Sequence, residues 1–173
     1  GRLTGKHVVY HYHENAFVMG LFYRILARAM QLLAHQIICV SKYQASFLRC
    51  KEKTVVIPNA LPQDFVDSVR PDAEAAFDRQ TVLMLSSLKG YKGTMESVRL
   101  SRRMPQYRFV LVINDTPQRP DSYIKAHCQH NALPQNLEVF SRQHNVVPFY
   151  QQASIVLNLS DKTLCIETFG LTA

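Results

Sequence analysis

The amino-acid sequence predicts an α/β fold in which parallel sheets are flanked by helices, and three observations support this. Short apolar runs alternate with longer helical segments along the 173 residues. The runs are apolar throughout rather than at every second position, as in strands buried on both faces. An acidic, irregular stretch at 61–79 interrupts the alternation, which then restarts. The interruption predicts an interdomain link and therefore two domains, at residues 1–62 and 63–173, each with its own parallel sheet.

The first domain is expected to contain three strands and two helices. The strands are rich in Val, Ile or Tyr and fall at Lys6–Tyr12, Gln36–Ser41 and Lys53–Ile57. A helix is expected at Ala16–Ala34. Its polar residues would form one narrow stripe on an otherwise apolar cylinder, and they are Arg24, Arg28, Gln31 and His35. A short helix is expected at Lys42–Cys50, with Ser41 as its N-cap.

The second domain is expected to repeat this alternation. Leu61–Arg79 would link the domains and include a surface helix. Strands are then expected at Thr81–Ser86, Tyr107–Ile113, Asn136–Phe140 and Ser154–Leu159. Helices are expected at Thr94–Met104, Ser122–Asn131 and Pro148–Gln152.

The positive charge is concentrated in the first third of the chain. The formal net charge is +7, of which residues 1–62 hold +6. Such asymmetry favours an anionic partner, which could be a nucleic acid, a phosphorylated substrate or an acidic membrane leaflet. A solvated basic surface without a partner is the alternative. The four cysteines are scattered along the chain, as in a protein with reduced thiols. The sequence shows neither a signal peptide nor an apolar segment long enough to cross a bilayer, so a cytoplasmic protein is expected.

Ligands of parallel α/β folds bind at the carboxyl ends of the strands, so the residues in the loops there are the candidates for binding and catalysis. His11 and His13 end the first strand and share a face with His7. No cysteine or carboxylate elsewhere has a matching ligand spacing, so no metal is expected. A histidine at the strand end could bind phosphate or move a proton, whereas His11 is expected to be a core residue bonded to the backbone.

Two further loops could bind an anionic group. The turn Ser87–Gly93 has two lysines and two glycines between a strand and a helix, although it is neither a Walker A loop nor a G-x-G-x-x-G motif. An ordinary solvent-exposed loop is the alternative. The segment Ser160–Leu171 has an acid before an expected helix start that contains Phe-Gly. A carboxylate there could accept hydrogen bonds from sugar hydroxyls, or could only stabilise the helix dipole.

Five segments in this order, spanning nearly the whole chain, resemble glycosyltransferases of family 4, also called group 1, which have the GT-B architecture. The segments are VVYHYHEN (Val8–Asn15), ICVSKYQASFL (Ile38–Leu48), VVIPNALPQDF (Val55–Phe65), SSLKGYKG (Ser86–Gly93) and VLNLSDKTLCIETFGLT (Val156–Thr172). The resemblance implies transfer of a sugar from a nucleotide-diphosphate sugar to a hydroxyl of a polysaccharide or lipid-linked glycan, with retention and without a metal or other cofactor.

The resemblance also assigns roles to residues. Lys92 would hold the leaving diphosphate, Glu167 would orient the donor sugar, and His13 would lie near the reaction centre. The remaining residues expected to bind the donor are Ser87, Lys89, Gly93, Phe169, Gly170 and Leu171. The enzyme would work in the cytoplasm, with peripheral contact to an anionic membrane. No nucleic-acid motif is present, and no carboxylate pair suits a hydrolase.

Two departures from the family pattern matter. Ser87 stands where members usually have an arginine, and Lys89 could supply the missing charge. Family members fold as two Rossmann-like domains, and the chain resembles only the C-terminal part of the acceptor-side domain, at 1–62, and the N-terminal part of the donor domain, at 63–173. The second glutamate of the family's E-x7-E motif would fall at position 175. A fragment inactive by itself is therefore expected. A GT-B nucleotide-sugar epimerase, or a truncated product without any function, is the alternative.

Overall fold

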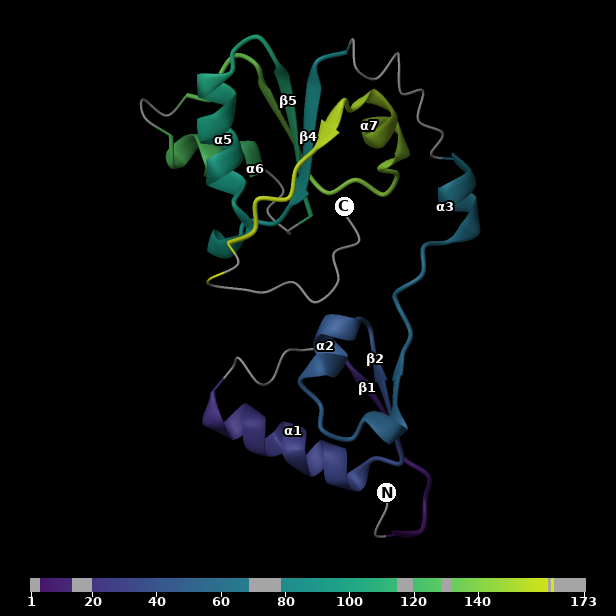
Figure 1. Ribbon diagram of the computed structural model, residues 1–173. Helices are drawn as coiled ribbons and strands as arrows, with labels where there is room; N and C mark the ends of the chain where they lie inside the picture. Colours follow the sequence, from purple (N-terminus) through teal and green to yellow (C-terminus); the bar gives the residue numbers. More distant parts are fainter. Residues whose placement is uncertain are drawn as a thin grey trace. The chain divides into compact units, whose positions relative to one another are not determined.

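A computed structural model describes residues 4–13, 20–68, 79–114, 120–128, 132–161 and 163 (Figure 1). The chain divides into two compact units. Unit 1 contains the residues up to Ala60, and unit 2 contains those from Leu61 to Cys165. No helix in the described ranges has the length and apolar character needed to cross a membrane.

Unit 1 is a parallel β-sheet with helices between its strands. Its elements are β1 (Val9–Tyr12), α1 (Leu21–Leu33), β2 (Gln36–Cys39), α2 (Lys42–Ser46), the 3₁₀ turn Lys51–Lys53 and β3 (Thr54–Val56). The strand order is β1-β2-β3, and both neighbouring pairs are parallel. The order of strands and helices expected from the sequence is therefore confirmed for this unit.

The core of unit 1 lies between the sheet and its helices. Met30 and Ala34 of the α1 region pack on Tyr12, Ile37 and Cys39 of the strands. Burial raises the pKa of the Cys39 thiol, which favours the protonated, unreactive form. These contacts fix one face of α1 against the sheet.

Helix α2 shows how a short helix is held at its start. Ser41 is its N-cap, as expected, because its Oγ accepts a hydrogen bond from the Gln44 backbone N–H at 3.1 Å. The fully buried Gln44 side chain in turn accepts a bond from the Val40 N–H at 3.0 Å. The helix ends at Ser46 rather than at Cys50.

The predicted polar stripe on α1 is partly wrong. Gln31 is buried, and its side-chain oxygen accepts a hydrogen bond from the Arg49 N–H at 2.8 Å. His35 lies beyond the helix end, where its Nδ1 accepts a bond from the Val8 N–H at 3.0 Å. Both side chains point inward because the partly buried backbone N–H groups of Val8 and Arg49 need hydrogen-bond acceptors. Residues 16–19 of the expected helix lie outside the described residues.

Unit 2 is a larger parallel sheet with the order β6-β5-β4-β7. Its strands are β4 (Thr81–Ser86), β5 (Arg108–Ile113), β6 (Leu137–Phe140) and β7 (Ile155–Val156). Its helices are α3 (Gln63–Ser68), α5 (Thr94–Arg103), α6 (Pro120–Ala126) and α7 (Val147–Gln152). The largest differences from the sequence expectation are in α6, which begins at Pro120 and ends at Ala126, and in the last strand, which is reduced to two residues.

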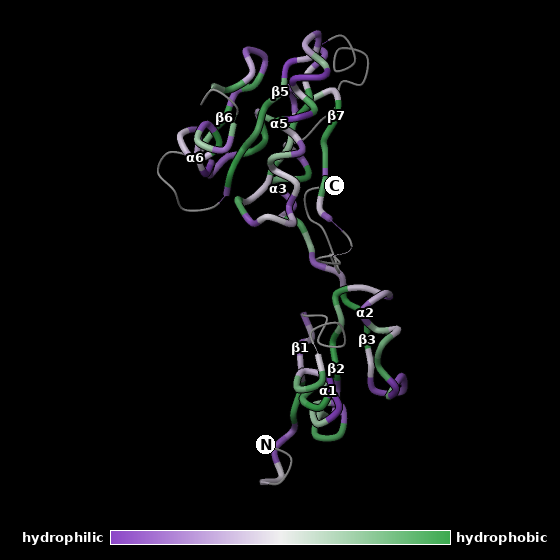
Figure 2. The backbone as a smooth tube through the Cα atoms, turned by 90° about the vertical axis from the view of Figure 1, so that its left-hand side faces the viewer, coloured by the Kyte–Doolittle hydropathy of each residue, from purple (hydrophilic) through white to green (hydrophobic). Residues whose placement is uncertain are grey.

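Both faces of the unit 2 sheet are covered, as the unbroken apolar runs predict. Alternate residues of β4 and β5, such as Met84 and Leu111, pack with Val98 of α5 and Ile124 of α6. The residues between them, Leu83, Val110 and Val112, belong to a separate buried cluster, against which side chains of α7 pack. The hydropathy of the chain is accordingly high along β5 (Figure 2).

Candidate active site

The carboxyl ends of β4 and β7 meet at the point where the strand order of unit 2 reverses. The strand β4 pairs with β5 on one side and with β7, much later in the chain, on the other. Parallel α/β sheets open a crevice for ligands at such a reversal. The loops that leave β4 and β7 are Ser87–Gly93 and Leu157–Asp161. They form the candidate site in the described part of unit 2.

These two loops are held together directly. The Asp161 backbone N–H donates a hydrogen bond to the Tyr91 carbonyl at 2.7 Å. Gly93 has a φ of +70° and packs so closely on Leu159 that a Cβ atom would lie 2.2 Å from the Leu159 carbonyl oxygen. Only glycine fits both the conformation and the space. In the structure this glycine lets the loop after β7 approach the turn.

A network of hydroxyl groups holds the base of the Ser87–Gly93 turn. The Thr94 hydroxyl donates to the Ser87 carbonyl at 2.7 Å and lies 3.1 Å from the Ser86 hydroxyl. Both Ser86 and Thr94 are buried. The sequence reasoning missed these two residues, although hydroxyl residues at a strand end and a helix start, on either side of a glycine-containing turn, are a recognisable signal.

Ser87 turns its side chain inward. Its hydroxyl oxygen is buried and has no hydrogen-bond partner among the described residues. Contact between this hydroxyl and a ligand therefore requires the side chain to turn outward. The Ser87 carbonyl meanwhile accepts the bond from Thr94, so the residue contributes to the shape of the turn.

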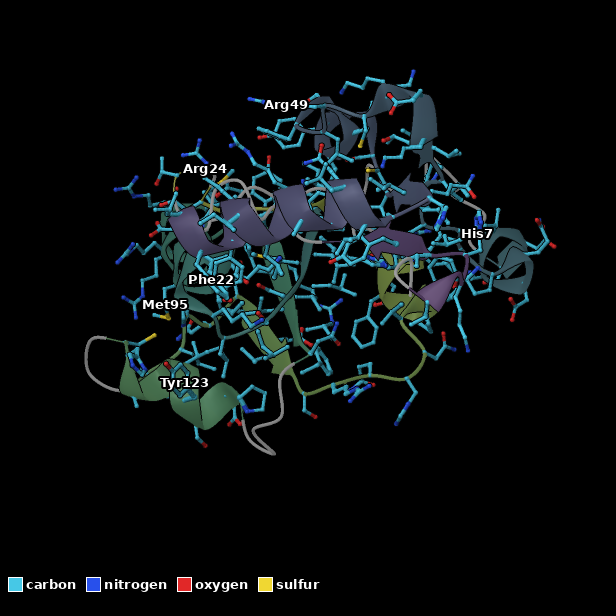
Figure 3. The ribbon with its side chains drawn as sticks, turned by 90° about the horizontal axis from the view of Figure 1, so that it is seen from below. His7, Phe22, Arg24, Arg49, Met95 and Tyr123 are labelled. Carbon is cyan, nitrogen blue, oxygen red and sulfur yellow. The ribbon has the colours of Figure 1, made fainter. Side chains whose placement is uncertain are left out.

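The two lysines of the turn differ in their surroundings. Lys92 is half-buried, and its Nζ lies 5.6 Å from the centre of the Tyr91 ring, within reach of a cation–π contact. Its backbone N–H donates to the Lys89 carbonyl at 2.9 Å, which closes the turn. Lys89 is exposed and lines a pocket of about 230 Å³ together with Met95 of α5 and Tyr123 of α6, which Figure 3 labels.

The structure thus brings four of the predicted site residues into one turn, namely Ser87, Lys89, Lys92 and Gly93. Glu167, Phe169, Gly170 and Leu171 lie outside the described residues. The turn presents two ammonium groups beside the start of α5, where the helix dipole also favours an anion. Its chemistry suits a group with more than one negative charge.

The histidines of unit 1 are arranged differently from the expectation. His11 is an exposed residue rather than a core residue, and its Nδ1 lies 3.2 Å from the Nε2 of His13. His7 stacks instead on His35, with ring centres 4.6 Å apart. In the described ranges no three histidines, cysteines or carboxylates are placed to hold a metal ion.

The His11–His13 pair borders a pocket of about 270 Å³ in unit 1. Aromatic and apolar side chains complete its lining, and they are Tyr10, Tyr12, Tyr23, Leu26, Ala27 and Met30. The pocket combines imidazole nitrogens and phenol hydroxyls with apolar walls. Such a lining suits a ligand that has both polar groups and an apolar face.

Several solved structures are similar to this chain, and two of them are those of HepE and TarM. No protein-family model and no curated protein matches the chain. HepE of Anabaena, solved in complex with UDP and glucose, matches with a TM-score of 0.63 and 17% identity, over 92% of this chain and 48% of HepE. TarM matches with a TM-score of 0.63 and 11% identity, over 89% of this chain and 32% of TarM.

The chain thus spans about half the length of HepE and about a third of TarM. At these identities the likeness is one of fold. The fold expected from the sequence is confirmed: this chain is an α/β protein of the GT-B type, with two parallel sheets flanked by helices.

Proposed function

We propose that this chain is part of a glycosyltransferase, which moves a sugar from a nucleotide-diphosphate sugar to a hydroxyl group. One observation carries the proposal. The turn Ser87–Gly93, with Lys89 and Lys92, lies at the strand-order reversal of unit 2 and is fixed there by the contact of Gly93 with Leu159. The presence of UDP and glucose in the structure of HepE, which has the same fold, supports this choice of donor.

The proposed chemistry follows from the charge that develops as the glycosidic bond breaks. The bond electrons pass to the leaving diphosphate, whose added negative charge the Lys92 ammonium stabilises. Lys89 supplies a second positive charge in place of the arginine usual at position 87. These two lysines, rather than a metal ion, are proposed to neutralise the diphosphate. Because the turn is already braced by Thr94, little reorganisation is needed when the charge forms.

The other roles remain part of the proposal. Glu167 would orient the donor sugar, and the backbone near Phe169, Gly170 and Leu171 would complete the donor site. His13 would lie near the reacting carbon, beside an acceptor hydroxyl of a polysaccharide or lipid-linked glycan. We propose transfer with retention, in the cytoplasm and against an anionic membrane surface, and we propose that the 173 residues alone are inactive.

Product analysis tests the reaction class. A longer protein that includes this chain should release UDP from UDP-glucose only when an acceptor glycan is added, and the glycan should gain mass. An isomerised nucleotide sugar without UDP release would contradict transfer.

Lys92→Ala tests the site. We expect a loss of roughly 100-fold in kcat/KM, the scale for removal of one preorganised charge-stabilising donor. Lys125→Ala, on helix α6, is the control for loss of a lysine elsewhere in unit 2 and should leave kcat/KM unchanged. Lys89→Ala should be as severe as Lys92→Ala if Lys89 replaces the missing arginine. Normal turnover by Lys92→Ala would contradict the placement of the donor diphosphate at this turn.

A further inference from the structure

Tyr91 belongs to the turn Ser87–Gly93, and the proposed function gives it no role. It is the middle residue of the 3₁₀ turn Gly90–Lys92, which leads directly into the left-handed Gly93. Its side chain is half-buried. The next residue is Lys92, whose ammonium group is proposed to hold the leaving diphosphate. The contacts of Tyr91 therefore affect how that ammonium group is placed.

The backbone around Tyr91 is held by two hydrogen bonds. The Tyr91 carbonyl accepts a bond from the Asp161 N–H at 2.7 Å, which ties it to the loop after β7. Lys92 donates its own N–H to the Lys89 carbonyl at 2.9 Å. These bonds leave the chain little freedom at this point, so the Tyr91 ring projects from a fixed stretch of backbone.

The side chains of Tyr91 and Lys92 meet although the two residues are adjacent in the sequence. Successive residues of a 3₁₀ turn point about 120° apart, so neighbours do not face each other by default. The lysine side chain has four methylene groups and is long enough to curve back. The Lys92 Nζ lies over the Tyr91 ring, 5.6 Å from the ring centre. This distance is within the about 6 Å over which an aromatic face attracts a cation.

A ring in this position reduces the freedom of a flexible side chain. A lysine in solvent samples many rotamers, and a charge that must first be ordered contributes less to a transition state than one already in place. The negative face of the ring favours the rotamers in which the Lys92 ammonium group stays over it. The attraction is electrostatic and needs no hydrogen bond, so an anion can bind the same ammonium group.

We infer that Tyr91 is a positioning residue that acts through Lys92, because its ring holds the ammonium group where the donor diphosphate binds. The inference rests on the proposed function and deepens it, since it names what places the cation of that site. It gives Tyr91 no contact with the substrate. Three properties follow. The aromatic ring matters, the phenol hydroxyl does not, and the effect disappears when Lys92 is absent.

Binding of inorganic pyrophosphate to the 173-residue chain, measured by isothermal titration calorimetry, tests the inference without sugar transfer. Tyr91→Leu removes the ring but keeps an apolar side chain, and it should weaken binding roughly fivefold. Tyr91→Phe keeps the ring and should bind as the wild type does. The matched control is Tyr43→Leu, which removes an exposed tyrosine of α2 in unit 1 and should also leave binding unchanged.

A double-mutant cycle shows whether the effect passes through Lys92. In the Lys92→Ala background, where Lys89 is still present, Tyr91→Leu should cause no further loss of pyrophosphate affinity, because no ammonium group is left to position. A tyrosine that only stabilised the fold, or that contacted the anion itself, would weaken binding by the same factor in both backgrounds.

Proton NMR of the same chain detects the contact itself. Protons over the face of an aromatic ring are shifted upfield. The ε-CH₂ resonances of Lys92, identified by their absence from the Lys92→Ala spectrum, should therefore lie upfield of ordinary lysine values in the wild type and in Tyr91→Phe. In Tyr91→Leu they should return to ordinary values.

The kinetic consequence is measured in a longer protein that includes this chain. There Tyr91→Leu should lower kcat/KM for the donor roughly fivefold, and Tyr91→Phe should leave it unchanged.

Equal losses in Tyr91→Phe and Tyr91→Leu would assign the effect to the hydroxyl group and overturn the inference. A loss that persists in the Lys92→Ala background, or the lack of an upfield shift in the wild type, would also overturn it. Failure of sugar transfer, with the pyrophosphate and NMR results as expected, would contradict only the proposed function.

Discussion

Gly93 shows how one residue can hold a site together. It adopts a left-handed backbone conformation that residues with side chains disfavour, and it contacts the Leu159 backbone. This contact holds the turn Ser87–Gly93 against the loop after β7. The sequence could predict that this turn contains glycines and lysines. It could not predict the partner of Gly93, because Leu159 lies 66 residues further along the chain and its approach depends on the strand order.

The substitution Gly93→Ala should destabilise unit 2. The positive φ alone costs about 1–3 kcal/mol, and the overlap of the new Cβ with the Leu159 carbonyl adds to it. The midpoint of urea unfolding, followed by circular dichroism, should fall accordingly. Gly90→Ala is the matched control, since nothing lies within 4 Å of its Cβ position and its φ is not positive, so its midpoint should change little. Similar midpoints for both variants would contradict this account of Gly93.

At the scale of single elements, the buried strands were the most predictable feature. Unbroken apolar runs such as Thr81–Ser86 allow few structures other than a strand covered on both faces. Boundaries were less predictable, because they depend on contacts that a local pattern does not contain. The last strand shows this, since SIVLNL is apolar enough for a longer strand but only Ile155 and Val156 pair with β4.

The neighbouring strands β5 and β6 are linked by a bidentate ion pair. The Arg108 guanidinium donates to both carboxylate oxygens of Glu138, at 2.6 and 3.0 Å. The hydrogen bond from Arg108 lowers the pKa of Glu138 below its ordinary value. Because the pKa of Glu138 is lower in the folded state than in the unfolded state, its ionised carboxylate stabilises the folded protein at any pH above the unfolded-state pKa. This stabilisation is lost as the pH falls through the folded-state pKa.

The variant Arg108→Gln should therefore be less stable than the wild type at neutral pH, by less than about 1 kcal/mol because the pair is half exposed. The difference in urea midpoint should vanish once the pH falls below the lowered pKa of Glu138. Arg142→Gln, which removes another exposed arginine, is the control and should show no such pH-dependent difference. A difference that persists in acid would mean that Arg108 stabilises the sheet through packing instead.

At the scale of the whole molecule, the chain covers about half of HepE and about a third of TarM. In keeping with the proposed function, we expect the 173 residues alone to give no measurable sugar transfer. A longer protein that includes this chain should give activity, measured as UDP release in the presence of acceptor.

In the longer protein, Glu167→Ala should then remove most of the transfer while leaving the unfolding transition unchanged. Robust sugar transfer by the 173-residue chain would contradict the expectation that these residues alone are inactive.

The pairing of β4 with both β5 and β7 has a consequence for the order in which the molecule is built. As the chain leaves the ribosome, β5 can pair with β4 soon after it emerges, whereas β7 pairs Ile155 with Val82, 73 residues earlier. Contacts between distant residues pay a larger loop-closure cost and form late. The strand β7 is also short, and Ile155 keeps 54% of its surface exposed, so it should be among the first parts to open in the native state. The loop after β7 is therefore expected to be the last part of the site to form. A ligand that contacts both loops would stabilise the pairing of β7 with β4.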